Sequence, residues 1–244
     1  MSEGARPASP LLGDDPYEDF DDDPYEDFDD VSPSKVPGVG HPLKTIWKRP
    51  RTTLRWILKT DPTYLVTPLA CAWGFNQALN RMAAKHLGDV WSTPALLGIA
   101  IVAGPLGGLF VLYVFGWIFS WSGRALGGKG NPQDVRAAIA WGQSPALAML
   151  AVHAVQIAAV GHEQFTRATP KLQASPGLQA FYAATMGVDL VLLWWMVALV
   201  LRCVGEAHRF SAWRALGAIL LGAFAYLVPL LVVMLVLARL AAVV

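Results

Sequence analysis

Charged residues are scarce in this chain of 244 residues, since Asp, Glu, Lys and Arg together account for only 15% of it. Soluble domains carry about 25% charged residues, so a free-standing soluble domain is excluded as the main part of the chain. Hydrophobic residues make up 55% of the sequence, and the mean hydropathy is +0.42. These values favour a protein that crosses a membrane several times.

Cysteine is also rare, because the chain contains only Cys71 and Cys203. We expect Cys71 near the middle of one apolar stretch and Cys203 near the end of another. Residues at different depths in the bilayer are too far apart for a disulfide. Both are interpreted as small apolar packing residues, and lipidation of Cys203 is the alternative.

Motifs typical of catalysis are absent, since neither Gly-x-Ser-x-Gly nor His-Glu-x-x-His occurs. Residues 123–130 come close to a phosphate-binding loop, but Gly130 stands where that loop needs Ser or Thr to hold Mg²⁺. The histidines and carboxylates show no spacing typical of a metal site. We therefore expect no enzyme activity, no cofactor, no metal and no nucleic-acid partner.

The first 34 residues lack the basic start and apolar core of a signal peptide. They hold twelve Asp or Glu and one Arg, with two copies of DDPYEDFD at 14–21 and 22–29. Such a segment cannot bury enough apolar surface to fold, so residues 1–42 are predicted to form a disordered acidic tail. The tail is either simply solvated or docks a protein partner through its aromatic residues Tyr17, Phe20, Tyr25 and Phe28.

Apolar sequence dominates the rest of the chain. Five stretches approach or exceed the roughly 20 apolar residues that a helix needs to cross a bilayer. They are residues 62–80, 94–121, 137–160, 178–204 and 218–240. We predict an all-α integral membrane protein in which five transmembrane helices form one bundle within residues 43–244.

The segment 43–60 is predicted to be a basic amphipathic helix ahead of the first stretch. Pro50 either breaks this segment or starts a helix at its first position. Such a helix lies flat at the headgroup level, where each Lys or Arg adds about 1 kcal/mol on an anionic surface. Anionic headgroups are expected along residues 44–59, chiefly at Trp47, Lys48, Arg51, Arg55, Trp56 and Lys59. Packing of the helix on the bundle is the alternative.

Basic residues cluster in every second gap between the apolar stretches. If the N-terminus is cytoplasmic, the cytoplasmic side carries thirteen Lys or Arg and the opposite side carries five. Since Lys and Arg are enriched on the cytoplasmic side of membrane proteins, we predict a cytoplasmic N-terminus and an external C-terminus.

Asp189 is the only acidic residue expected deep within a predicted span. The other polar residues expected at membrane depth are Asn76, Gln77, His153 and Gln156. A contact of Asp189 with His153 or Asn76 is expected. Three interpretations stay open: hydrogen bonds between helices that fix their packing, a proton or ion relay, and an Asp189 that is simply protonated.

Proline and glycine occur inside the predicted spans. Pro105, Pro145 and Pro229 each remove a helical hydrogen bond, so a kink is expected at each. Gly104 and Gly108 have the Gly-xxx-Gly spacing that lets a neighbouring helix approach closely.

A glycine-rich loop follows the second predicted span. Its residues Gly127, Gly128 and Gly130 permit positive φ at the end of that helix. Asn131 is predicted to cap the next helix, with Pro132 at its first position and an acidic residue in its first turn.

Two stretches together carry a family resemblance. One is Ile46-Trp47-Lys-Arg-Pro-Arg-Thr-Thr, and the other is Leu126-Gly-Gly-Lys-Gly-Asn131, followed by Ile139-Ala-Trp141 and Pro145. Over residues 43–240 the chain resembles the prokaryotic branch of the Yip (Ypt/Rab-interacting protein) domain family. The resemblance implies five spans, a cytosolic N-terminus and the cytoplasmic membrane of a prokaryote. Eukaryotic members are linked to Rab GTPases and vesicle traffic, and this chain lacks their Asp-Leu-Tyr-Gly-Pro motif.

Two functions are consistent with this sequence. The first is a non-enzymatic membrane protein that organises membrane or recruits partners, with self-association as a further option. The alternative is a small channel or an ion- or proton-coupled transporter that uses Asp189 and His153.

Overall fold

The protein is described by a computed structural model for residues 40–241, and every regular element in this range is a helix. The predicted acidic tail lies outside the described residues up to residue 39. Four helical stretches are long and apolar enough to cross a membrane, namely Thr93–Ala125, Pro132–Phe165, Pro176–Ala207 and Ala212–Leu235. The prediction of an all-α integral membrane protein is therefore confirmed.

The first predicted span corresponds to α3 (Val66–Ala84), which has 19 residues. It would extend over about 28 Å at 1.5 Å per residue. However, α3 is not among the four stretches that meet the criteria of length and apolar composition. The reason is its polar content, since it carries three amides and a basic residue, Asn76, Gln77, Asn80 and Arg81. The count of five spans stays a prediction.

The third predicted span is not one continuous helix. It consists of α5 (Pro132–Gly142) and α6 (Ala146–Val160), separated by a turn at residues 143–145. The sequence predicted a kink at Pro145 within a continuous helix. Pro145 instead directly precedes the first residue of α6. Proline has no N–H and restricts the residue before it, so the chain turns here instead of continuing the helix.

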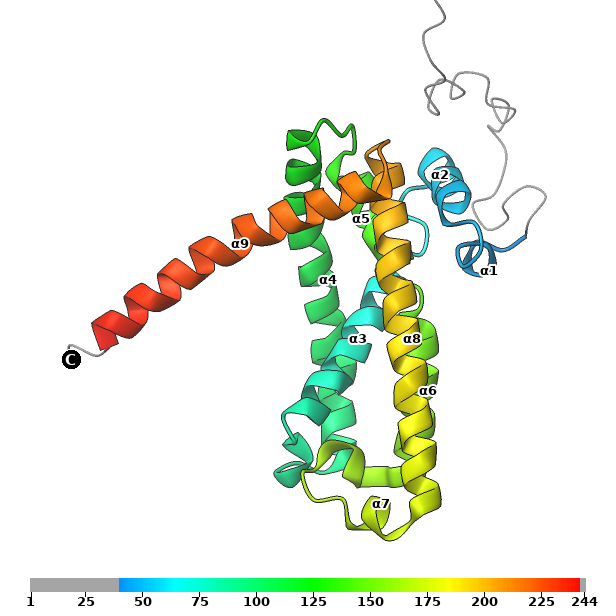
Figure 1. Ribbon diagram of the computed structural model, residues 1–244, viewed down its shortest axis with the longest axis vertical. Helices are drawn as coiled ribbons and strands as arrows, with labels where there is room; N and C mark the ends of the chain where they lie inside the picture. Colours follow the sequence, from blue (N-terminus) through cyan, green and yellow to red (C-terminus); the bar gives the residue numbers. More distant parts are fainter. Residues whose placement is uncertain (1–39, 242–244) are drawn as a thin grey trace, which may run out of the picture. The chain divides into compact units, whose positions relative to one another are not determined.

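The longest helices are α4 (Thr93–Ala125), α8 (Pro176–Ala207) and α9 (Ala212–Ala241). As predicted, Pro105 lies inside α4 and Pro229 lies inside α9. Helix α3 packs along α4, α6 packs along α8, and α5 contacts both α4 and α8 (Figure 1). Contacts between α3 and α6 join the two pairs of helices.

Glycine brings α3 and α4 into backbone contact, as the Gly-xxx-Gly spacing predicted. A Cβ added at Gly74 of α3 would lie 2.1 Å from the carbonyl oxygen of Gly104, and a Cβ at Gly108 would lie 2.3 Å from that of Ala70. No side chain fits at these positions. The close approach therefore fixes how α3 lies against α4.

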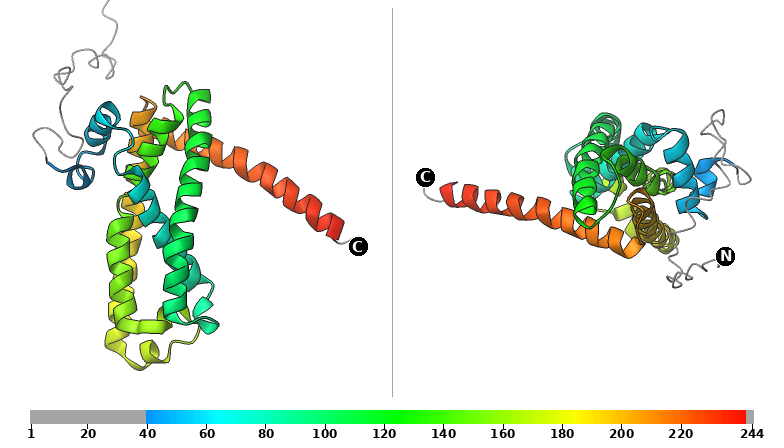
Figure 2. Two further views of the ribbon diagram at one scale, coloured as in Figure 1. Left: turned by 180° about the vertical axis from the view of Figure 1, so that it is seen from behind. Right: turned by 90° about the horizontal axis from the view of Figure 1, so that it is seen from above.

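Helix α9 packs on α4 and α8 through its first half. The Phe115 and Tyr226 rings lie 5.6 Å apart between centroids, and the backbone of Gly222 approaches Ile118 and Phe119. The large apolar side chains from Leu227 to Leu235 are exposed. This part of α9 extends away from the other helices (Figure 2).

Short elements lie at both ends of the long helices. At one end α1 (Pro42–Thr45) leads into α2 (Pro50–Thr60), which packs on α5 and α8. At the opposite end are η2 (Leu87–Asp89), η3 (Gly161–Phe165) and α7 (Pro170–Ala174). There Asp89 accepts a hydrogen bond from the Arg167 backbone at 3.1 Å, and His162 donates one to the Gly88 carbonyl at 2.8 Å.

We expect Gly108→Ala to lower the free energy of unfolding by about 1–3 kcal/mol, because its methyl group overlaps the backbone of α3. Gly107→Ala is the matched control, since a Cβ at Gly107 meets nothing within 4 Å. Alanine is the better helix former, so the control should be neutral or slightly stabilising. Thermal unfolding of both variants in detergent measures the difference. Equal melting temperatures would contradict the proposed close contact.

Candidate functional site

Three segments carry most of the basic charge and meet at one end of the helices. We call residues 41–61, 124–136 and 202–214 the basic end. Together they contain twelve Lys or Arg and three Asp or Glu. Arg55 Nε of α2 donates to Glu206 Oε1 of α8 at 2.7 Å, and the Lys129 N–H donates to the His208 carbonyl at 3.1 Å. Segments far apart in the sequence thus form one positively charged surface.

Helix α2 begins at Pro50, as one of the two predictions for this proline stated. Leu54 and Ile57 are fully buried, and they belong to the same apolar core as residues of α5 and α8. This arrangement agrees with the alternative in which the amphipathic helix packs on the bundle. Contact of its basic side chains with lipid headgroups stays a prediction.

The six residues expected at the lipid surface differ in exposure. Lys48 and Lys59 are exposed, whereas Trp47, Arg51 and Arg55 are half-buried. Trp56 is a correction: the prediction placed it at the lipid surface, but only 6% of it is exposed. Trp56 is buried together with Leu54 and Ile57 because α2 packs on α5 and α8.

His208 lies in the turn between α8 and α9 and is 1% exposed. Its Nε2 donates to the Phe119 carbonyl at 3.2 Å, and its Nδ1 accepts from the Gly130 N–H at 3.2 Å. The ring also stacks on Phe210 with centroids 5.1 Å apart. An imidazole that accepts at Nδ1 and donates at Nε2 is neutral.

The glycine-rich loop is shaped around this histidine. Gly127 has φ +86°, which confirms the predicted positive φ at the end of α4. Gly128 and Gly130 serve another purpose, because a Cβ on either would lie within 2.8 Å of His208 Nδ1. Asn131 accepts a hydrogen bond from the Asp134 N–H at 2.8 Å, so the predicted helix cap is confirmed. The role of His208 was not predicted from the sequence, because no local sequence pattern links it to Gly130, 78 residues earlier.

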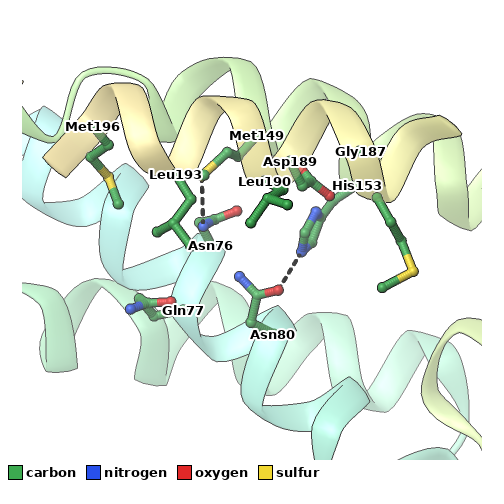
Figure 3. A pocket seen from close by; sticks show the side chains of 11 residues that line it. Asn76, Gln77, Asn80, Met149, His153, Gly187, Asp189, Leu190, Leu193 and Met196 are labelled. Atoms are coloured by element: carbon green, nitrogen blue, oxygen red, sulfur yellow. Dashed lines mark hydrogen bonds between the residues drawn. The ribbon is translucent and has the colours of Figure 1, made fainter. Parts of the chain in front are cut away.

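A polar cleft of about 540 Å³ lies between α3, α6 and α8 (Figure 3). It brings together four of the polar residues predicted at membrane depth, Asn76, Gln77, His153 and Asp189. Gln156 lies beside the cleft and donates to Asp189 Oδ2 at 3.3 Å. The structure therefore brings these polar residues together, as predicted. Within the described residues, however, Asp189 forms no hydrogen bond with His153 or Asn76, the two contacts that were expected.

Other hydrogen bonds tie the cleft residues to neighbouring helices. Asn80 Oδ1 accepts from His153 Nε2 at 3.2 Å, and the Asn76 amide donates to the Met149 sulfur at 3.7 Å. Gln156 also donates to Thr185 Oγ1 at 3.1 Å and accepts from Gln164 at 3.2 Å. These bonds connect α3 to α6 and α6 to α8, which is the packing role that the first interpretation gave them.

Among residues 40–241 no group of three or more His, Cys, Asp or Glu side chains is arranged to hold a metal ion. Both cysteines are free thiols, as expected, and Cys203 is buried. The arrangement is that of a multi-pass helical membrane protein with a basic end and a polar cleft. Neither feature defines a reaction.

Comparison with known protein families assigns the chain. The model of the Yip1 domain matches residues 44–236, and the chain belongs to this family. The family is associated with membrane trafficking and is not known for enzymes. No curated protein and no solved structure matches the chain.

The buried His208 makes stability depend on pH. Burial lowers the pKa of His208 below its ordinary value of 6.5; the bond to the Phe119 carbonyl opposes this and the charge of Arg124 reinforces it. His208 therefore takes up a proton near pH 6.5 in the unfolded chain, but only at lower pH in the folded chain. The contribution of His208 to the free energy of unfolding is fully present above pH 6.5 and declines as the pH falls.

We expect the melting temperature to drop between pH 7.5 and pH 5.0, and His208→Gln to reduce that drop. Glutamine cannot titrate, so the variant loses this contribution even if it is less stable throughout. His41→Gln is the control, because His41 is exposed. Thermal unfolding in detergent across the pH range provides the measurement. Identical pH profiles for the wild type and His208→Gln would rule out this role.

Proposed function

We propose that the protein is a non-enzymatic membrane protein that organises an anionic membrane surface, or recruits partners to it, through its basic end. The observation that carries this proposal is the concentration of twelve basic and three acidic residues in three segments that contact one another. Each Lys or Arg near an anionic lipid surface contributes about 1 kcal/mol. The Yip1 family assignment supports a role in membrane organisation.

The proposal includes five spans, with the basic end on the cytoplasmic side of a prokaryotic cytoplasmic membrane. Support comes from α3, which packs against α4 and, with 19 residues, has nearly the length of a span. The excess of Lys and Arg at the basic end supports its cytoplasmic placement. The opposite end, with η2, η3 and α7, would then face outward.

The number of spans decides whether the two chain ends lie on the same side. We expect a tag before residue 1 to be protected from protease added to intact cells, and a tag after residue 244 to be cleaved. Five crossings place the ends in different compartments, whereas the four most apolar stretches alone would return the chain to its starting side. Protection of both tags would overturn the five-span proposal.

We expect anionic lipid to stabilise the protein through the basic end. In nanodiscs, replacing phosphatidylcholine by a mixture with phosphatidylglycerol should raise the melting temperature of the wild type. The triple variant Lys44→Gln, Lys48→Gln, Arg49→Gln should lose about 3 kcal/mol of this lipid effect, because these three side chains are exposed at the basic end. The difference should shrink with added salt.

The matched control neutralises three exposed basic residues at the opposite end, Arg81, Lys85 and Arg167. It removes the same charge without touching the basic end. If both triple variants respond equally to anionic lipid, the effect is due to net charge and not to the proposed surface.

The acidic tail is proposed to compete with lipid for the basic end, because its twelve acidic residues are opposite in sign to the excess of nine basic residues there. Deleting residues 1–34 should then enlarge the stabilisation by phosphatidylglycerol. An unchanged lipid response would show that the tail does not compete, and docking of another protein on its aromatic residues would be the next hypothesis.

A further inference from the structure

The polar cleft between α3, α6 and α8 is not needed for the function proposed above. Its volume of about 540 Å³ is within the range of small-molecule sites, about 300–1,000 Å³. Helix α6 forms its floor, since it packs on both α3 and α8. Met186, Leu190 and Leu193 border it from α8 and are exposed, so the cleft opens sideways from the bundle.

Three hydrogen-bond acceptors in this cleft have no partner among the described residues. His153 is one: its Nε2 donates to Asn80 Oδ1, and when the ring is neutral its Nδ1 carries the free lone pair. The others are Asn76 Oδ1 and Asp189 Oδ1. His153 and Asn76 are only 5% and 3% exposed, so each unpartnered atom carries the cost of a buried polar group without a hydrogen bond.

Within the part of the chain that the structure describes, Asp189 forms no salt bridge. Its carboxyl group accepts one hydrogen bond, from Gln156, and no Lys, Arg or His nitrogen of residues 40–241 lies within 4.0 Å of it. A carboxylate inside an apolar helix is costly unless a cation or a proton neutralises it. In Figure 3 the Asp189 carboxyl group and the His153 ring point toward one another, with Asn76 and Asn80 on the facing helix.

The chemistry of the acceptors selects the cation. Alkali and alkaline-earth ions prefer shells made of oxygen, whereas here an imidazole nitrogen and the Met149 sulfur are part of the lining. A primary ammonium group has three N–H donors, and it matches three unpartnered acceptors of which one is charged. The remaining lining is mostly apolar, from Met186, Leu190, Leu193 and Met196.

We propose that the cleft binds the protonated primary amine of an amphiphilic molecule. The ammonium group lies among Asn76, His153 and Asp189, and the hydrocarbon chain lies along Leu190 and Leu193 of α8. The acceptor atoms are covered in this structure, so the half-buried Asp189 side chain rotates to reach the ligand. The amine belongs either to a free long-chain amine or to a lipid with an ethanolamine headgroup.

Binding of radiolabelled dodecylamine to the full-length protein tests the proposal. The protein is reconstituted in nanodiscs of phosphatidylcholine, and partitioning into empty nanodiscs is subtracted. We expect saturable binding that unlabelled dodecylamine displaces and that 1-dodecanol, which has the same chain without the charge, displaces at least ten-fold less well. Nanodiscs that contain phosphatidylethanolamine distinguish the two sources, because a headgroup ligand would compete with the probe.

Asp189→Asn should weaken dodecylamine binding at least ten-fold, since it removes the counter-ion but keeps the shape. Asp134→Asn, at the basic end and outside the cleft, should leave binding unchanged. Leu193→Phe narrows the cleft without altering its polar groups and should also weaken binding, which keeps a test available if Asp189→Asn does not fold. Equal displacement by dodecanol, or unchanged binding in both Asp189→Asn and Leu193→Phe, would overturn the proposal and leave Asp189 as a protonated packing residue.

Discussion

The contact between α3 and α4 is the constraint on which the rest of the arrangement depends. At Gly74, Gly104 and Gly108 the two backbones approach so closely that a single methyl group would overlap backbone atoms of the facing helix. Between membrane helices, close packing of this kind replaces the hydrophobic effect as the source of association, since lipid tails are as apolar as the helices. The contact holds the more polar α3 against the strongly apolar α4.

Because α3 is held in this way, two of its amides bond side chains of α6, one of them the buried Asn76. Asn76 reaches Met149, and Asn80 reaches His153. Gln156 then connects α6 to Asp189 of α8. Polar side chains at membrane depth need partners within the protein. Within the described part of the chain, Asn76, His153 and Asp189 beside the cleft each have one such partner and one polar atom without a partner. The packing interpretation and the binding proposal therefore concern the same residues.

The basic end is held together by different interactions. His208 is enclosed by the glycine-rich loop, and its two ring nitrogens bond backbone groups of α4 and of the segment before α5. Arg55 ties α2 to α8 through Glu206. The charged residues thus lie on a framework whose positions are set by buried, largely uncharged contacts. A membrane surface that binds there would meet a preformed site and would not have to order it.

Much of this protein was determined by the sequence alone, because the signals concerned are local. Each of these signals can be recognised within a short stretch of sequence. They are the long apolar stretches, Pro50 at the start of a helix, the Asn131 cap and the Gly-xxx-Gly spacing. The grouping of Asp189 with His153 also followed from depth in the bilayer. Only the tertiary structure decided what depends on contacts between distant segments: the burial of Trp56, the break before α6, and the enclosure of His208 by Gly128 and Gly130. No short-range pattern encodes which surfaces meet, so these features became visible only once the helices were packed.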